Sequence, residues 1–392
     1  MIGPECFDRE ARRKGTSCIK WDFQAGDCGR EGLLPFFIAD ADWPTAPGVV
    51  EALRRRVEHG VFGYTDAEDG YYEAVVRWFQ KRHSLSIQRE WIVPTAGIVP
   101  SISLAVMLFT DPGAGVVVQP PVYDPFYSVV EANGRKVLCN DLLLRDGRYE
   151  MDYGDLEAKL RAGAQMLILC SPHNPVGRVW TREELERCAG LCAQYGAILV
   201  SDEIHCDLTM EGVSHFSAGR LDCIRDRLVL CTAPSKSFNI AGLQTSNIII
   251  PSRELREKYQ GWLCARYQFT PNALGLVACR AAYETGEEWM DAQRAYLTAN
   301  YRYLADFFQR EIPLGKVADT QGTYLVWVDL TALGKTSEAL VVELAKRGAA
   351  VNGGRHYGEH YDGFIRVNIA CPRAQLREGL AIIARTVREC AP

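Results

Sequence analysis

The segment MLILCSPHNPVGRVWTREELERCAGLCAQYGAILVSDE, residues 166–203, decides the fold because it alternates two kinds of pattern. It opens with the apolar run Met166–Cys170 and ends with another at 197–201. Short unbroken runs of this kind are typical of strands buried on both faces of a parallel sheet. Between them, Thr181 and Glu184 have the spacing of a capping box, which predicts the start of a helix. The segment therefore predicts a strand, a helix and a second strand.

The same alternation continues on both sides of this segment. Further apolar runs occur at 116–119, 228–231 and 247–250, and stretches of helical length separate them. This order of strands and helices predicts an α/β domain whose mainly parallel sheet is covered by helices on both faces.

The two ends of the chain have a different character. The first residues are rich in glycine, proline and charge, which predicts an arm followed by a short strand at 36–39. A long helical pattern at 289–305 precedes alternating segments at 324–328 and Phe364–Asn368, with a helix between them. We therefore predict three parts. They are an N-terminal arm with part of a small domain (1–48), a large domain (49–288) and a small C-terminal α+β domain (289–392).

Composition excludes several classes of protein. Of the 392 residues, 47% are hydrophobic and 24% charged, which excludes a disordered or fibrous chain. The 44 basic and 49 acidic residues give a formal net charge of -5, which disfavours nucleic acid as a partner. We expect the short basic runs at 12–14 and 54–56 to lie on solvated helix faces.

The sequence also carries expectations about location. No apolar run approaches the ~20 residues needed to cross a bilayer, so no membrane association is expected. The 14 cysteines lack the spacing of a disulfide framework, which favours reduced thiols and a cytoplasmic location.

Lys236 is the first candidate for chemistry. It follows the predicted strand at 228–231, in the turn-rich segment APSKSFNIAGL at 233–243. Apolar neighbours desolvate an amine and favour its neutral, nucleophilic form, as a Schiff-base lysine requires. The alternative is a lysine that extends from a loop into solvent.

Other polar residues follow neighbouring predicted strands. Asp202 comes directly after the run at 197–201, and Asn174 lies just after Met166–Cys170. In open α/β sheets ligands bind at the carboxyl ends of the strands, so these side chains should converge with Lys236. A carboxylate there can keep a heteroaromatic nitrogen protonated. Gly97 precedes another helical run, and a helix that begins at a glycine can bind phosphate. A phosphate site beside a Schiff-base lysine points to pyridoxal phosphate.

These residues resemble the aminotransferase class I/II superfamily of pyridoxal-phosphate enzymes, which has fold type I. Within it, the chain is most similar to the MalY/PatB family of cystathionine beta-lyases, also called C–S lyases. The motifs that carry the resemblance are KWD (20–22), IADAD (38–42), FGYT (62–65), PVYDPF (121–126), NPVG (174–177), DEIH (202–205), SK (235–236) and FIRVN (364–368). The resemblance implies a seven-stranded sheet in the large domain and a small domain built from both termini. It also implies a homodimer with active sites at the subunit interface.

The resemblance implies a role for each matching residue around the cofactor ring. Lys236 would carry the cofactor and then move the proton at the substrate Cα. Asp202 would pair with the ring nitrogen. Asn174 would bind the ring hydroxyl with His205 supporting the same edge, and Tyr123 would stack on the ring face as a second catalytic residue.

The resemblance also implies how the phosphate and the substrate are held. The residues expected at the phosphate are Gly97, Ile98, Ser235 and the partner subunit's Tyr64. Arg366 would bind the substrate α-carboxylate as a bidentate fork, which a lysine cannot provide. Ala39 would lie beside the substrate.

The implied reaction is the α,β-elimination of cystathionine, cysteine or a related S-substituted cysteine to pyruvate, ammonia and a thiol. Two departures from aminotransferases favour this lyase reaction. Gln244 stands where many aminotransferases have an arginine, and His205 stands where they commonly have a tyrosine. The alternatives are an aminotransferase and a non-catalytic regulatory protein on the same scaffold.

Three other features favour structural interpretations. His356 and His360 lie in a glycine-rich segment without a third ligand, so no metal site is expected. The aromatic stripe of Tyr71, Tyr72, Trp78 and Phe79 has helical spacing and indicates core or dimer-interface packing. Cys206 is expected to be a small packed residue.

Overall fold

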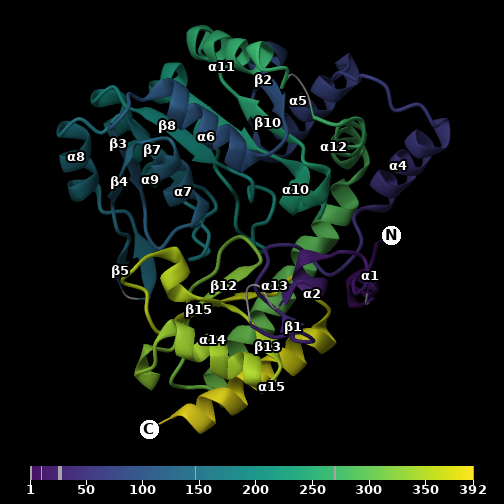
Figure 1. Cartoon of the computed structure of the whole chain (residues 1–392), viewed down its shortest axis with the longest axis vertical. Helices are drawn as coiled ribbons and strands as arrows, with labels where there is room; N and C mark the ends of the chain where they lie inside the picture. Colours follow the sequence, from purple (N-terminus) through teal and green to yellow (C-terminus); the bar gives the residue numbers. More distant parts are fainter. Residues whose placement is uncertain (1, 10, 25–28, 146, 269–270, 392) are drawn as a thin grey trace.

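The computed structural model describes residues 2–9, 11–24, 29–145, 147–268 and 271–391. A large sheet with its helices occupies the upper part of Figure 1, and a smaller sheet with the C-terminal helices lies below it. The large sheet has seven strands, which in spatial order are β2 (Ile92–Thr95), β10 (Ser246–Ile249), β9 (Leu228–Thr232), β8 (Ile198–Asp202), β7 (Met166–Cys170), β3 (Gly115–Val118) and β4 (Lys136–Cys139).

This sheet confirms the predicted fold class. The strands β9, β8, β7, β3 and β4 are mutually parallel, and only β10 runs against its two neighbours. The sequence analysis located five of the seven strands and missed the two edge strands, β2 and β4. β2 contains a proline, and β4 is partly exposed, so neither has the unbroken apolar pattern of a central strand.

Two apolar layers cover the sheet. Along β7, Met166 and Ile168 face one layer, whereas Leu167 and Leu169 face the other. The first layer packs against α6 (Ile98–Phe109), α7 (Pro125–Ala132) and α11 (Arg253–Ala265). The second packs against α5 (Asp69–His83), α8 (Tyr153–Arg161), α9 (Arg182–Gln194) and α12 (Ala273–Thr285). Strands with apolar side chains on both faces therefore lie inside the domain, as the unbroken runs predicted.

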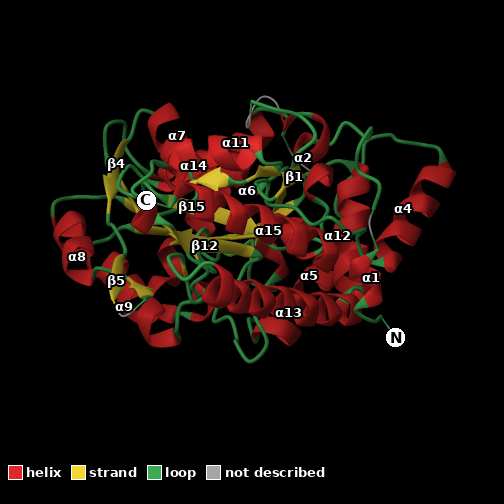
Figure 2. Cartoon of the chain, turned by 90° about the horizontal axis from the view of Figure 1, so that it is seen from below, coloured by secondary structure: helices red, strands yellow, loops and turns green. Residues whose placement is uncertain are grey.

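The smaller sheet is antiparallel. Its strands are β11 (Lys316–Val317), β12 (Leu325–Asp329), β15 (Phe364–Asn368) and β14 (Asn352–Gly353). Three helices accompany it, namely α13 (Glu287–Glu311), α14 (Ser337–Lys346) and α15 (Arg373–Cys390). Figure 2 shows the long α13 beside α15, against which it packs. The predicted helix at 289–305 and the strands on either side of α14 are confirmed.

The strand predicted at 36–39 is wrong in position. The strand in this region is β1 (Leu34–Pro35), which pairs in parallel with β13 (Ala349–Ala350). Strand pairing ends after Phe36 because the following carbonyls accept hydrogen bonds from side chains. Phe37 O accepts from Arg366 Nη2 at 2.5 Å, and Ile38 O accepts from Asn368 Nδ2 at 2.6 Å.

The remaining elements are short or peripheral. The helices are α1 (Glu5–Asp8), α2 (Ile19–Asp22), α4 (Pro47–His59) and α10 (Pro234–Ser237), and β5 (Leu143–Arg145) pairs with β6 (Arg148–Glu150). Short 3-10 turns occupy Arg89–Trp91, Ala218–Arg220, Asp222–Arg227, Ala241–Leu243, Thr331–Leu333 and Gly354–Tyr357.

Several surface and core predictions can be compared with the structure. The basic run at 54–56 lies on α4, where Arg54 is exposed. The run at 12–14 is not helical, and Arg13 is half-buried in ion pairs, so that prediction is wrong for Arg13. Tyr71, Trp78 and Phe79 are buried in the core, as expected. The described cysteines are all free. Within the described ranges, each helix is too short or too polar to span a lipid bilayer.

Candidate active site

A cavity of about 220 Å³ lies at the carboxyl edge of the large sheet. The sheet register explains the position, because Cys170, Asp202 and Cys231 lie side by side at the ends of β7, β8 and β9. The cavity is lined by Ala39, Ala96, Gly97, Ile98, Val99, Pro100, Tyr123, Cys170, Asn174, Asp202, Ile204, His205, Ser235, Lys236, Ala241 and Gln244. The structure therefore brings together nine of the residues predicted from sequence, in one cavity.

Lys236 lies on the short helix α10, which follows β9. Its Nζ donates a hydrogen bond to the carbonyl of Ala39 at 2.6 Å. Burial lowers the pKa of the amine to about 8; the Asp40 and Asp202 carboxylates oppose this effect, and Arg366 adds to it. A substantial fraction of the amine is therefore neutral, and hence nucleophilic, near physiological pH.

Asp202 is the last residue of β8, and its carboxylate is buried. Its Oδ1 accepts a hydrogen bond from the backbone N–H of Ile204 at 3.1 Å. Burial raises the pKa of this carboxyl to about 7, although the Ile204 N–H and Lys236 favour the charged form. A cationic group placed against Asp202 would lower this pKa again, so the site is suited to a protonated heteroaromatic nitrogen.

Arg366 enters the site from β15 of the small sheet. Arg366 as a whole is 4% exposed, and its guanidinium donates to Asn174 Oδ1 at 3.1 Å and to Asn352 Oδ1 at 2.8 Å. Its Nε has no hydrogen-bond partner. Among the described residues, no carboxylate forms an ion pair with Arg366. A buried guanidinium held only by amide and carbonyl oxygens can still receive an anionic carboxylate.

Two aromatic side chains complete the walls. His205 lies in the turn after β8, and its Nδ1 is buried without a partner. Burial, with Lys236 and Arg366, lowers the pKa of His205 to about 3, so the ring is neutral. Burial raises the pKa of Tyr123 to about 12, so its phenol stays protonated.

One end of the cavity is formed by the start of α6. Gly97 precedes the helix with φ 155°, and the helix begins at Ile98. The N–H groups of a first helical turn lack partners within the helix and attract anions. Ser235 and Gln244 also line the cavity. This arrangement can hold a phosphate, and Gln244 adds a neutral amide to the lining.

Sequence reasoning missed two residues that organise the site. The Tyr324 hydroxyl donates to Ala39 O at 2.9 Å, so it shares this acceptor with Lys236. Asn239 binds the carbonyls of Ala41 and Trp43 at 2.9 and 2.8 Å. Tyr324 could have been suspected because it is the first residue of the strand predicted at 324–328. No local pattern identifies Asn239.

A sequence model for the family described as aminotransferase class I and II matches residues 38–383. The chain belongs to the aminotransferase class I and II family. The matched region contains every predicted site residue, from Ala39 to Arg366.

Relatives within this family are similar over nearly the whole chain. Cystathionine beta-lyase PatB of Bacillus subtilis (strain 168) is 42% identical over 377 residues, which cover 95% of this chain and 97% of PatB. Protein MalY of Escherichia coli (strain K12) is 37% identical over 386 residues, covering 97% and 98% of the two chains. The solved structure of cystalysin from Treponema denticola, which contains a pyridoxal 5'-phosphate cofactor, has a TM-score of 0.95 and 34% identity. That match covers 99% of this chain and 100% of cystalysin.

Tyr64 is the predicted site residue that lies away from the cavity. It follows α4 on an exposed segment, and its side chain is fully exposed, with a relative exposure of 112%. The neighbouring Val61 and Phe62 are also exposed, at 61% and 57%. In a single chain Tyr64 therefore makes no contribution to this site.

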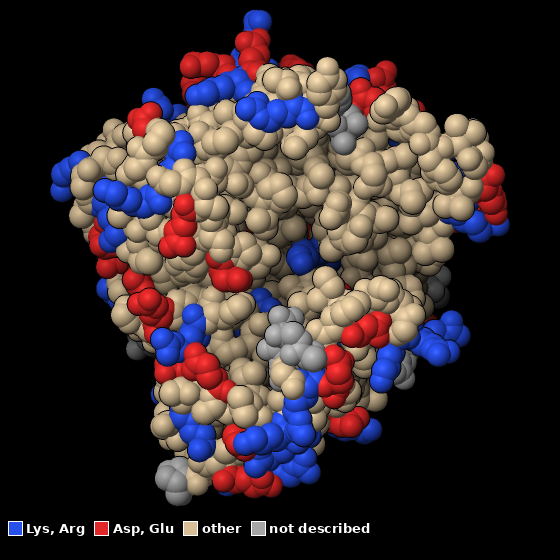
Figure 3. All heavy atoms as spheres, viewed as in Figure 1, with Lys and Arg blue, Asp and Glu red and all other residues tan. Residues whose placement is uncertain are grey.

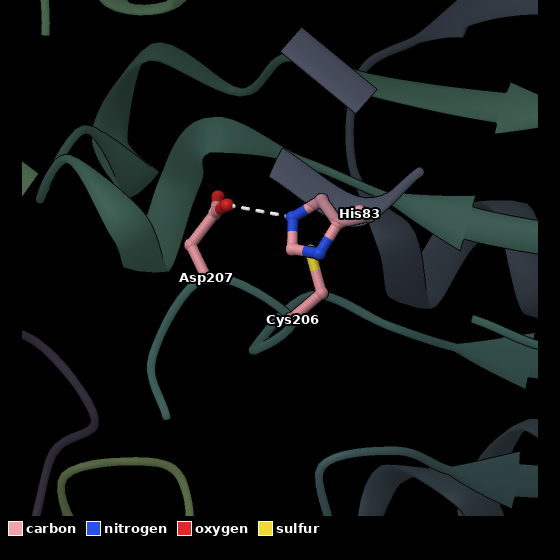
Figure 4. A group of neighbouring side chains, drawn as sticks. All are labelled: His83, Cys206 and Asp207. Carbon is pink, nitrogen blue, oxygen red and sulfur yellow. Dashed lines mark hydrogen bonds and ion pairs between the residues drawn. The ribbon is translucent and has the colours of Figure 1, made fainter. Parts of the chain in front are cut away.

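A second group of buried side chains comes from α5 and from the turn after β8. Within the described ranges, His83, Cys206 and Asp207 are close enough to share a metal ion (Figure 4). However, Asp207 accepts hydrogen bonds from His83 Nε2 at 2.8 Å, Trp78 Nε1 at 3.1 Å and Ser237 Oγ at 2.8 Å. Its oxygens are thus occupied by donors, which indicates a structural network. Burial raises the pKa of the Cys206 thiol well above its usual value, in keeping with a packed residue.

The outer surface shows an opening on one face. Figure 3 shows a hollow near the centre of the face seen in Figure 1, with basic side-chain atoms at its bottom. Acidic and basic side chains are interspersed around the rest of this face.

The two histidines of the glycine-rich segment lie apart from the group in Figure 4. The exposed His356 has its Nε2 3.5 Å from Asp124 Oδ2. Among the described residues, neither His356 nor His360 lies in a group of side chains close enough to share a metal ion.

Proposed function

We propose that this protein is a pyridoxal-phosphate-dependent C–S lyase. It eliminates the sulfur group from cystathionine, cysteine or a related S-substituted cysteine and yields pyruvate, ammonia and a thiol. The observation that carries the proposal is that the Lys236 amine and the buried Asp202 carboxylate line one cavity, while the Arg366 guanidinium binds Asn174 of the same lining. The similarity to PatB supports the lyase reaction.

The residues at the cavity fit this cofactor. Lys236 has an amine of lowered pKa at the cavity wall, and Asp202 offers a buried carboxylate to a ring nitrogen. The unpartnered Nδ1 of His205 points to a polar group missing from its surroundings. We assign the ring to Asp202, Asn174, His205 and Tyr123, and the phosphate to Gly97, Ile98 and Ser235. Lys236 would be the attachment point.

When bound, pyridoxal phosphate supplies an electron-withdrawing ring that stabilises negative charge at the substrate Cα. Asp202 keeps the ring nitrogen protonated and so maintains that property. Arg366 binds the substrate α-carboxylate and orients the Cα–H bond toward Lys236. The free Lys236 amine accepts the Cα proton, and the Cβ–S bond breaks with its electrons leaving on sulfur, which takes up a proton to give the thiol. Water then hydrolyses the released three-carbon enamine to pyruvate and ammonia.

We also propose that the protein acts as a cytoplasmic homodimer. The exposed Val61, Phe62 and Tyr64 form an apolar segment that a second subunit could cover, and this would bring the partner subunit's Tyr64 to the phosphate. The free state of the described cysteines supports a reducing compartment.

A product assay tests the proposed reaction. Purified protein is incubated with cystathionine, without a keto acid, and both pyruvate and thiol are measured. We expect equal amounts of the two products, and Lys236→Ala should lose both the activity and the visible absorbance of the cofactor. Amino transfer to an added keto acid without pyruvate formation would instead identify an aminotransferase. A protein that takes up no cofactor would identify a non-catalytic scaffold.

A further inference from the structure

The backbone beside Lys236 is held by side chains from several parts of the chain. We call residues 36–43 the Ala39 segment. Its Ala39 carbonyl accepts hydrogen bonds from Lys236 Nζ and from the Tyr324 hydroxyl. Asn368 Nδ2 donates to Ile38 O at 2.6 Å and to Asp40 O at 2.7 Å. The position of the Ala39 carbonyl, on which the reactive amine rests, therefore depends on how this segment is anchored.

The N-terminal arm anchors the same segment through charge. Arg13 forms a bidentate ion pair with Asp40, through Nη1–Oδ1 at 2.9 Å and Nη2–Oδ2 at 2.6 Å. Its Nη1 also lies 2.9 Å from Asp42 Oδ1. Lys20, which is buried, lies 2.9 Å from Asp42 Oδ2 and 3.3 Å from Asp40 Oδ1. The arm thus places two cations against two carboxylates, and the cluster is neutral as a whole.

This cluster directly adjoins the reactive lysine. Asp40 is the residue after Ala39, and it is the charged neighbour that most strongly favours the protonated form of Lys236, ahead of Asp202. The other titratable or charged groups that face Lys236 are Asp202 and His205 from the end of β8, Arg366 from β15, and Tyr123 and Tyr324 from the flanking loops. Removal of one cation from the cluster would leave a net negative charge next to the amine.

We propose that Arg13 is a positioning residue that clasps Asp40, fixes the Ala39 carbonyl under the Lys236 amine and shields that amine from the Asp40 charge. The proposal rests on the proposed role of Lys236 as the cofactor lysine. Arg13 acts through Asp40 and touches neither the cavity nor the lysine itself. A half-buried fork of this kind is retained more firmly than a pair of exposed side chains.

Variants that neutralise one or both partners of the Arg13–Asp40 ion pair test the proposal. Arg13→Gln should raise the pH midpoint of the visible absorbance change of the bound cofactor by roughly 0.5–1 unit, since a nearby negative charge favours a protonated nitrogen. Asp40→Asn should lower it by a similar amount. The double variant Arg13→Gln/Asp40→Asn restores neutrality and should return to within roughly 0.2 unit of the parent protein. Arg13→Lys keeps the charge without the fork, so its midpoint should lie between those of the parent and of Arg13→Gln.

The matched control is Arg12→Gln, which removes the same charge from the adjacent exposed residue and should leave the midpoint unchanged. The proposal is overturned if Arg13→Gln and Arg12→Gln behave alike, or if the two single variants shift the midpoint in the same direction. A double variant that is more perturbed than either single variant would also overturn it, since that result indicates general damage to the arm. Thermal unfolding of each variant identifies misfolded protein. If Arg13→Gln is misfolded, the midpoints of Arg13→Lys and of the double variant decide the outcome.

A second measurement separates this inference from the proposed function. In the cofactor-free protein, Lys236 is labelled with trace acetic anhydride across a pH series, and the modified peptide is quantified by mass spectrometry. The labelling midpoint should move in the same directions as the absorbance midpoint. If Lys236→Ala still shows the cofactor absorbance, the proposed function fails. If Lys236→Ala loses it but Arg13→Gln leaves both midpoints unchanged, the role of Arg13 alone fails.

Discussion

At the residue scale, burial acts in opposite directions on the two central charges of the site. It lowers the pKa of the Lys236 amine to about 8 and raises the pKa of the Asp202 carboxyl to about 7. Both shifts disfavour charge, because the low-dielectric cavity solvates neither ion well. The two groups are therefore close to changing protonation state near neutral pH, which suits an attachment amine and a ring-nitrogen partner.

Asp202→Asn should change both stability and activity. In the cofactor-free protein, the native state retains the Asp202 proton between about pH 4 and 7, whereas the unfolded state has lost it, so the native state loses stability as the pH rises through this window. Asparagine abolishes this loss. The free energy of unfolding of the variant, relative to that of the parent, should therefore rise by a few kcal/mol from pH 4 to pH 8, at about 1.4 kcal/mol per pKa unit.

Urea unfolding of both cofactor-free proteins at pH 4.5 and pH 8 measures this difference (these pH values are roughly the ends of the window). With cofactor, kcat of Asp202→Asn should fall by about 100-fold or more, because the ring nitrogen loses its charged partner. An equal stability difference at both pH values would contradict the raised pKa of Asp202.

At the element scale, the site is a meeting point of strand ends and one helix start. β7, β8 and β9 end in register, so the residues that follow them reach the same cavity. The helix α6 contributes its N-terminus rather than a side chain, and Gly97 lets the chain enter the helix with φ 155°. Other residues rarely adopt this backbone conformation.

Gly97→Ala should therefore weaken phosphate binding as well as the fold. A Cβ at this position would meet Pro100 Cδ at 3.5 Å, which is ordinary contact, so the cost comes from the backbone and amounts to about 1–3 kcal/mol. Fluorescence titration of the cofactor-free protein with pyridoxal phosphate should show that the variant binds the cofactor at least about tenfold more weakly than the parent does.

The control for this variant is Gly190→Ala, in the interior of α9, where a Cβ would have open space. Alanine favours a helix over glycine by about 1 kcal/mol, so this variant should be slightly stabilised with unchanged cofactor affinity. If both variants bind the cofactor as the parent does, the start of α6 is not the phosphate site.

At the scale of the whole molecule, segments from both ends of the chain meet beside the cavity. Ala39 lines the cavity, the arm binds the neighbouring Asp40 through Arg13, and Arg366 of the small sheet binds Asn174 of the lining. The exposed Tyr64 is the one predicted site residue left outside, and the proposed dimer accounts for it.

Subunit mixing tests this arrangement. Lys236→Ala and Tyr64→Ala should each be nearly inactive, since every site of either homodimer lacks one residue. A mixed dimer contains one site that combines the intact Lys236 of one subunit with the intact Tyr64 of the other. After exchange of subunits in equal amounts, we therefore expect recovery of up to roughly a quarter of the parent activity, by the statistics of symmetric pairing. Activity that stays at the sum of the two separate variants would argue against Tyr64 acting across an interface.

Much of this arrangement could be predicted from local pattern. The unbroken apolar runs at β7, β8 and β9 identified a buried sheet, and the positions of Asn174, Asp202 and Lys236 after these runs placed them at one edge. Periodicity and turn chemistry operate over a few residues, so they can be read from the chain directly. The same local reasoning failed for the strand at 36–39, where side chains from β15 replace strand pairing.

The amino-acid sequence by itself determined the α/β class, the family resemblance and the set of residues expected at the cavity. Only the tertiary structure decided which residues anchor them. Arg13 looked like part of a solvated basic run but pairs with Asp40, 27 positions away, and Arg366 contacts Asn174 across 192 positions. Such contacts depend on how whole segments pack against one another, and the free energy of burying a charge is set by the groups that packing brings beside it.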